Sequence, residues 1–362
     1  MGKIRHTLEV LSKHLRAFPL VVLLIPLVAF ILICDRFYPL HQPWQNVPPN
    51  STQTALYQRL ADAGLSGDEL ATVGALTLGY KEELSKDLRH HFQASGAAHV
   101  LAVSGLHTGI LYGLLIWLLT LGGRFRPMHE NRFGRCALSL LIIAAMWAYA
   151  WLTGLTPSVV RAVLMVTIFE IGRMFYRQSL SINTVSAAAV LILLFHPSDL
   201  WSISFQLSFA ATFVIIVFAR YMERHIPRRE WKDTDQHPVL RWIIGTVIVS
   251  LAAQLGTLGI SMYYFHQVSC YFLLTNLIVL PIAAILVPCG LGCVALGGSP
   301  IGIVLGYPTA FLAQAMNSSV AWIESLPGST MEAKVSLPMV GVYYVLLACF
   351  LYFLIHKGRK IT

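Results

Sequence analysis

The chain has 362 residues, of which 56% are hydrophobic and only 12% carry a charged side chain. Soluble domains carry about 25% charged residues, so this composition excludes an ordinary soluble protein and indicates many membrane-spanning segments. The formal net charge of +9 does not by itself indicate a nucleic-acid partner, because basic residues in a membrane protein first report its orientation.

The chain begins with a basic segment that contains Lys3, Arg5, Lys13 and Arg16, followed by an apolar run from Phe18 to Cys34. This pattern is similar to a signal peptide. No small-residue cleavage site follows it, so we expect a retained membrane anchor.

Apolar stretches of membrane-spanning length recur along the rest of the chain. A helix needs about 20 apolar residues to cross a bilayer. The ten candidate spans are 18–36, 99–120, 136–153, 157–175, 180–196, 202–219, 240–261, 269–296, 301–323 and 337–355. The sequence therefore predicts an all-α polytopic transmembrane helix bundle of about ten spans.

Basic residues collect in alternate loops, which indicates the orientation. The predicted inner loops are 121–135, 173–179, 220–239 and 297–300, and the first three of them contain arginines. The outer loops 154–156, 197–201, 262–268 and 324–336 contain one lysine, Lys334, and no arginine. Since cytoplasmic loops are enriched in Lys and Arg, we expect both termini to be cytoplasmic.

This topology divides the chain into four parts. They are 1–36, a cytoplasmic tail and first span; 37–98, an extracytoplasmic linker and amphipathic helix; 99–356, the transmembrane domain; and 357–362, a basic cytoplasmic tail. Within 37–98, Ser66-Gly-Asp-Glu69 predicts a capping box that starts the amphipathic helix. That helix lies either on the outer membrane face or against the bundle.

Two spans carry signs of interruption. The stretch 269–296 contains Pro281 and Pro288, and proline removes a helical hydrogen bond. The stretch 180–196 is short and ends at His196-Pro197, so it is a candidate re-entrant segment. Broken helices at membrane depth are tolerated where they line water or protein.

Polar residues within the predicted spans form the candidate substrate pathway. They are Ser104, His107, Arg161, Gln206, Gln254 and Asn276. The predicted topology places five of them, all except Ser104, between the outer surface and the midplane on five different helices. Ser104 precedes His107 by three residues. One such residue often serves only to join helices, but five at similar depth favour a shared polar vestibule.

Arg161 is the most informative of these residues because its neighbours Val160 and Ala162 are lipid-like. A guanidinium held there would attract an anion, with phosphate as the natural candidate. The alternative is a structural pairing with an acidic or backbone group. Glu170 stands at helical spacing from Arg173, so we interpret it as part of a charge pair rather than as a catalytic group.

An enzymatic hypothesis rests on Ser104 and His107, whose spacing places both on one helix face. An intramembrane serine hydrolase needs a serine that a histidine activates. The residues Ala102-Val-Ser-Gly105 lack the leading glycine of a nucleophile elbow, and the chain has no Walker A, metal or dinucleotide motif. The six cysteines lack metal-ligand spacing. We therefore expect no enzyme activity, no metal and no cofactor.

Four stretches of the chain together resemble the ComEC-type competence protein family. They are His99-Val-Leu-Ala-Val-Ser-Gly-Leu-His107, Thr156-Pro-Ser-Val-Val-Arg-Ala162, Ser204-Phe-Gln-Leu-Ser-Phe209, and Phe265-His-Gln-Val-Ser269 continuing into Leu274-Thr-Asn-Leu-Ile-Val-Leu-Pro281. The resemblance implies a channel in the bacterial inner membrane that takes up single-stranded DNA during natural transformation. It also implies a cytoplasmic DNA-translocating motor and periplasmic DNA-binding proteins as partners, while homo-oligomerisation stays open.

The sequence departs from this family in two places. Its members often carry an extracytoplasmic OB-like domain and a metallo-β-lactamase-like domain, and segment 37–98 is too short for the former. The sequence ends at Thr362, so we expect the channel portion alone, without a nuclease. A permease for a small anionic solute or lipid is the main alternative function, and the hydrolase at Ser104 is the other.

Overall fold

The computed structural model describes residues 19–37, 51–101, 103–120, 132–175, 182–225 and 238–357. In these ranges the chain is almost entirely helical, which confirms the predicted all-α class. The first helices are α2 (Pro19–Phe37), α3 (Ser51–Asp62), α4 (Gly67–Leu78), α5 (Lys86–Ala94), α6 (Ala98–Leu101), α7 (Gly105–Leu119) and α9 (Arg132–Leu152). They are followed by α10 (Pro157–Met174), α11 (Ile182–Phe195), the 3₁₀ helix η1 (Pro197–Trp201), α12 (Ile203–His225), α14 (Pro238–Phe265), α15 (Phe272–Leu296), α16 (Pro300–Glu324) and α17 (Leu337–Lys357).

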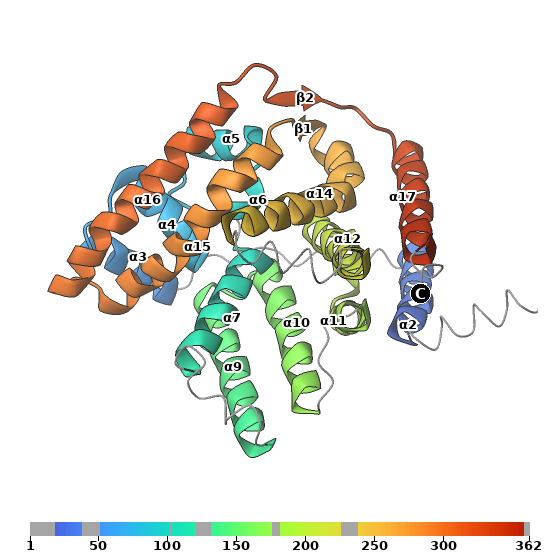
Figure 1. Ribbon diagram of the computed structural model, residues 1–362, viewed down its shortest axis with the longest axis horizontal. Coiled ribbons are helices and arrows are strands. Elements are labelled where there is room, and N and C mark those ends of the chain that lie inside the picture. The colour runs from blue at the N-terminus through green and yellow to red at the C-terminus, as the bar shows by residue number, and fades with distance from the viewer. Residues whose placement is uncertain are drawn as a thin grey trace, which may run out of the picture.

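A short antiparallel ribbon is the one β-structure among the described residues. Its strands are β1 (Gln267–Ser269) and β2 (Thr330–Glu332), and Val268 pairs with Met331. The ribbon joins the chain after α14 to the chain before α17, at the edge of the helical assembly (Figure 1).

Nine of the ten predicted spans each fall on one helix, the span 99–120 contains α6 and α7, and three of the helices are long and apolar enough to cross a membrane. The three segments are Phe133–Leu152, Val239–Phe265 and Phe272–Leu296. Five shorter apolar helices are Leu23–Asp35, Gly105–Leu119, Ile182–Phe195, Ile203–Ala219 and Leu337–Phe353. Large apolar side chains stand exposed on many of them, which is typical of a membrane protein. The count of ten spans and the cytoplasmic position of both termini stay predictions; residues 1–18 and 358–362 lie outside the described part.

Helices α3, α4 and α5 pack beside α15 and α16 (Figure 1). The segment 51–94 therefore contains three short helices where the sequence predicted a linker and one amphipathic helix. Ser66 does precede α4, but its side chain forms no capping hydrogen bond, so the predicted capping box is wrong. All of α4 from Ala71 to Leu78 is buried. Of the two alternatives for this segment, the structure thus shows packing against other helices.

A glycine makes the close approach of α16 to this layer possible. A Cβ atom at Gly306 would lie 1.9 Å from the carbonyl oxygen of Ala63. Real side chains cannot approach a backbone oxygen so closely, because the packed interior leaves no room to move it. Gly306 therefore brings α16 into direct backbone contact with the turn after α3.

Two predictions about helix continuity are wrong. The predicted span 99–120 is divided, because Ser104 has extended backbone angles (φ −119°, ψ 177°) and caps a new helix at Gly105. The predicted interruption at Pro281 and Pro288 is absent, since both lie inside the continuous helix α15. Neighbouring groups in a membrane protein can satisfy the backbone carbonyls that such prolines leave without a donor.

Candidate functional site

Ser104 and His107 form a hydrogen-bonded cap at the start of α7. The Ser104 hydroxyl accepts a hydrogen bond from the backbone N–H of Leu106 at 3.3 Å, and Nδ1 of His107 accepts one from the backbone N–H of Ser104 at 3.0 Å. This is the reciprocal arrangement of a capping box, with histidine in the place of glutamate. The apolar run through residues 99–120 concealed this helix start, although the Ser-x-x-His spacing was visible in the sequence.

The pair also has the separation that a serine nucleophile and its base would need, since the Ser104 hydroxyl lies 3.2 Å from Nδ1 of His107. A catalytic histidine is normally oriented through its second ring nitrogen. His107 is fully buried, and its Nε2 has no hydrogen-bond partner among the described residues. The short distance is therefore explained by helix capping.

Arg161 is buried at the junction of α10 and α12, with 2% of its surface exposed. Its Nη2 donates to the hydroxyl of Ser204 at 2.6 Å, to the backbone oxygen of Ser204 at 2.9 Å and to the hydroxyl of Ser158 at 3.2 Å. Within the part of the chain that the structure describes, its Nε and Nη1 have no partner. A buried donor without an acceptor is costly, and these two donors are free to bond a further acceptor.

The surroundings of Arg161 are positive at two helix ends. Ser158 and Ser204 are the second residues of α10 and α12, and their hydroxyl oxygens lie 3.3 Å apart. Helix N-termini carry a partial positive charge and attract anions. Asp199 of η1, which is also buried, is close enough for its charge to act on Arg161. The carboxylate of Asp199 thus offsets part of the positive charge at Arg161 and the two helix N-termini.

The three remaining predicted residues have different surroundings. Gln206 donates from Nε2 to the backbone oxygen of Leu200 at 3.0 Å and so anchors the segment before α12. Asn276 donates from Nδ2 to the hydroxyl of Ser250 at 3.0 Å, while its Oδ1 has no partner in the described ranges. Gln254 is half-buried and lies one helical turn after Ser250, on the same side of α14.

The five helices that bear these residues contact one another in a closed ring. Helix α7 packs against α10, α10 against α12, α12 against α14, α14 against α15, and α15 against α7. The start of α7 approaches α10 closely: a Cβ at Gly105 would lie 4.0 Å from Cβ of Ala162. These two residues follow Ser104 and Arg161 directly in the sequence. The convergence of all the residues on one cavity stays a prediction.

A buried charge network on α7, α9 and α10 was largely missed from the sequence. Glu170 is fully buried and accepts hydrogen bonds from Tyr112 at 2.5 Å and Ser139 at 2.6 Å. Its carboxylate also pairs with Arg173 at 3.1 Å. The sequence indicated the pairing with Arg173 but not the hydroxyl donors on the other two helices, because a single tyrosine or serine in an apolar span carries no distinctive signal.

Comparisons with known proteins agree with the arrangement of motifs. A family model described as "Competence protein" matches residues 76–358. ComE operon protein 3 of Bacillus subtilis (strain 168) is 32% identical over 218 residues, which are 60% of this chain and 25% of that protein. Recombination protein 2 of Haemophilus influenzae is 26% identical over 214 residues, 59% of this chain and 26% of that protein.

The uncharacterized protein YcaI of Escherichia coli (strain K12) is 27% identical over 212 residues, 59% of this chain and 27% of that protein. This chain thus matches about a quarter of the length of these curated relatives. No solved structure matches it.

Proposed function

Because this chain belongs to the competence protein family, we propose that it forms a channel for the uptake of single-stranded DNA across the bacterial inner membrane during natural transformation. The family match covers residues 76–358 and therefore includes every residue of the candidate pathway. The proposal gives these residues one role, which is to provide polar contacts for the DNA strand within an apolar helix assembly.

The closed ring of α7, α10, α12, α14 and α15 supports this proposal. A strand that crosses the hydrocarbon layer has to be surrounded by protein, because polar and charged groups are costly in lipid. Each helix of the ring carries at least one of the predicted pathway residues. We propose that the strand passes between these helices, on the side to which their polar groups are turned.

The observation that carries the proposal furthest is the open guanidinium of Arg161. Its Nη2 is fixed by Ser158 and Ser204, while Nε and Nη1 are donors without partners among the residues described. Each of these donors can give one charge-assisted hydrogen bond to a phosphate oxygen. Single-stranded DNA offers one phosphate per nucleotide, so a fixed arginine can contact successive phosphates as the strand moves.

We propose a non-enzymatic role, with single-stranded DNA and the lipid bilayer as the direct partners. A cytoplasmic motor that pulls the strand and periplasmic proteins that deliver it are further proposed partners, and assembly of several copies is compatible with the ring. The hydrogen bonds of Ser104 and His107 support the absence of hydrolysis, because helix capping already accounts for their proximity.

The test uses a strain that lacks the gene and carries either the wild-type chain or a variant, with transformation frequency normalised to membrane-inserted protein. A charged hydrogen bond contributes about 1.5–3 kcal/mol, so Arg161→Ala is expected to lower the normalised frequency by about 10- to 100-fold. Arg161→Lys keeps the charge but loses the planar fork and is expected to recover only part of it.

Arg173→Ala is the matched control, since Arg173 is another buried arginine of α10 but is paired with Glu170. It is expected to lower the amount of protein in the membrane while the frequency per molecule stays near that of the wild type. A normal normalised frequency for Arg161→Ala would reject the phosphate contact. Unchanged transformation after deletion of the gene would reject the DNA channel and favour the permease alternative.

A further inference from the structure

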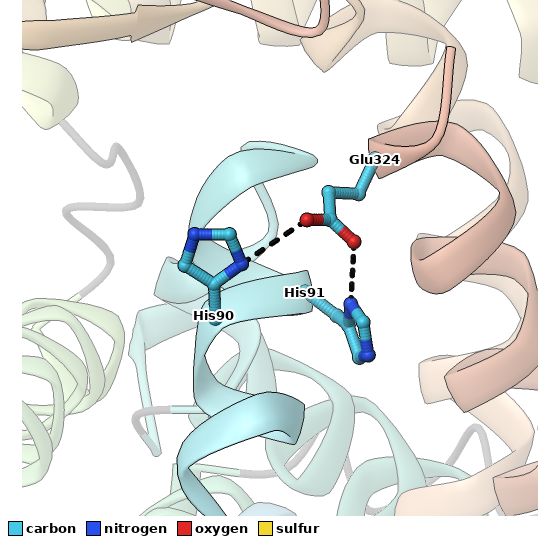
Figure 2. A group of neighbouring side chains, drawn as sticks. All are labelled: His90, His91 and Glu324. Carbon is cyan, nitrogen blue, oxygen red and sulfur yellow. Dashed lines mark hydrogen bonds and ion pairs between the residues drawn. The ribbon is translucent and has the colours of Figure 1, made fainter.

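Three side chains that are common metal ligands meet outside the ring, where α5 lies beside the end of α16. Figure 2 shows His90 and His91 on either side of the Glu324 carboxylate. Nδ1 of His90 lies 3.1 Å from Oε1, and Nδ1 of His91 lies 2.5 Å from Oε2. The ligand atoms of the three residues all lie within 4.8 Å of one another. The cluster thus joins α5 to α16, and its residues His91 and Glu324 are 233 positions apart in the sequence.

Both helices that present these ligands are firmly anchored. Ser85 caps α5 by accepting a hydrogen bond from the N–H of Leu88 at 3.1 Å, and Phe92 on the inner side of α5 is fully buried. Beside Glu324, Ile323 of α16 is also fully buried. Ligands on packed helices keep their positions better than ligands on loops, which favours a preformed site.

The electrostatics of the cluster favour a cation. Glu324 is the last residue of α16, and His91 lies in the last turn of α5. Helix C-termini carry a partial negative charge, so a carboxylate there is unfavourable unless a positive charge is close to it. Two helix ends and one carboxylate thus place negative potential between the two imidazoles.

The cluster is also accessible to an ion from solution. The side chain of His90 is 68% exposed, that of His91 is 34% exposed, and that of Glu324 is 24% exposed. A water molecule is expected to complete the coordination from the exposed side. Two histidines, one glutamate and a water make a common zinc coordination set.

We propose that His90, His91 and Glu324 bind one divalent transition-metal ion of the zinc type. Each histidine binds through Nδ1, so its ring proton resides on Nε2, and the carboxylate binds in its ionised form. The ion replaces the present contacts of the carboxylate with the two imidazoles and cross-links α5 to α16. Imidazole ligands disfavour Mg²⁺ and Ca²⁺, which prefer oxygen. The proposal is independent of the DNA channel.

The experiment uses the full chain without a histidine tag, purified in lipid nanodiscs and stripped of metal with EDTA. Titration with Co²⁺ is followed by its visible absorption, and titration with Zn²⁺ by calorimetry. We expect one equivalent of Zn²⁺ to bind and to displace Co²⁺, while millimolar Mg²⁺ or Ca²⁺ does not. Zn²⁺ is also expected to raise the unfolding temperature, because it binds only the folded site.

Glu324→Gln is the decisive variant, since glutamine can still hydrogen-bond both imidazoles, accepting through its oxygen and donating through its amide nitrogen, but is a poor metal ligand. It is expected to weaken Zn²⁺ binding by at least about tenfold, the lower end of the loss seen when even outer-shell partners of a metal site are changed. His90→Gln removes the most exposed ligand and is expected to weaken binding similarly with little effect on folding. Glu332→Gln, the same change at an exposed position of β2, is the matched control and is expected to bind Zn²⁺ normally.

Tryptophan fluorescence in the absence of metal verifies that each variant is folded. The absence of saturable Zn²⁺ binding to the wild-type chain would overturn the proposal. Equal Zn²⁺ affinity in the wild type, Glu324→Gln and His90→Gln would also overturn it, and the cluster would then be a hydrogen-bonded clamp between α5 and α16.

Discussion

Replacement of Glu170 with alanine tests whether the buried charge network holds α7, α9 and α10 together. The carboxylate has no exposed surface and accepts hydrogen bonds from Tyr112 and Ser139 while it pairs with Arg173. Removal of one member of a buried ion pair typically costs about 3–5 kcal/mol, because the other charge stays buried. We expect Glu170→Ala to lower the free energy of unfolding by about this amount.

The two hydroxyl donors provide a graded comparison. Tyr112→Phe and Ser139→Ala each remove one hydrogen bond to a charged acceptor, which contributes about 1.5–3 kcal/mol. Each is therefore expected to destabilise the protein less than Glu170→Ala does. The assay is denaturant unfolding of the purified chain in detergent micelles, followed by circular dichroism, with membrane-inserted protein in cells measured in parallel.

Two results would refute this reasoning. If Glu170→Ala is no less stable than Ser139→Ala, the ion pair with Arg173 makes no net contribution to stability. If Glu170→Ala keeps its stability but loses DNA uptake per molecule, the carboxylate acts in transport and not in holding the helices together.

Two further predictions concern orientation and the cap of α7. Cys270 is exposed and follows the predicted outer loop 262–268. In a variant whose other five cysteines are replaced with serine, it is expected to react with a membrane-impermeant maleimide in intact cells. Protection of Cys270 until the cells are lysed would contradict the predicted orientation. Ser104→Ala is expected to lower stability by about 1 kcal/mol because it removes an N-cap, whereas Ser104→Asn, which caps equally well without a nucleophile, should keep both stability and transformation. Loss of function in both variants at normal protein levels would contradict a capping role alone and show that the hydroxyl itself is needed.

The helices could be predicted from the sequence because hydropathy is a local property. Nine of the ten apolar stretches each fall on one helix, and the stretch 99–120 contains α6 and α7. Continuity was predicted less well, since it depends on context. The division before Gly105 lies inside an apolar run, where only the Ser104 cap reveals it. Pro281 and Pro288 are strong local signals for a break, yet the neighbouring helices allow α15 to continue.

The packing of segment 51–94 could not be predicted because its partners are distant in the chain. Thr72 of α4 donates to Asn317 of α16 at 2.9 Å, and Gln53 of α3 donates to the backbone oxygen of Leu78 at 3.0 Å. Amphipathic spacing indicates that one face of such a helix is covered, but not by what. The same limit applies to Glu324, whose two histidine partners gave no metal-ligand spacing in the sequence.

In the candidate site, too, the sequence identified individual polar residues but not their hydrogen-bond partners. Arg161 and Asn276 stood out from the sequence because polar groups are rare within apolar spans. Their partners Ser204 and Ser250 did not stand out as partners, since hydroxyl residues are common in membrane helices, where they bond to their own backbone. Depth along a span can be read from hydropathy, whereas the direction of a side chain toward another helix depends on how the helices are arranged.

Arg161 and Glu170 are both buried on α10, but they differ in how their polar atoms are partnered. Glu170 follows Arg161 by nine residues, and at about 100° per residue the two side chains leave opposite sides of the helix. The side of Glu170 faces Tyr112 and Ser139, and three donors satisfy its carboxylate. The side of Arg161 faces Ser204, and two of its donors have no partner in the described part of the chain. The burial of Arg161 is offset in part by its hydrogen bonds to Ser158 and Ser204 and by the charge of Asp199. We propose that an anion occupies the open donors, and for this reason Arg161 is the residue at which the DNA-channel proposal is most directly tested.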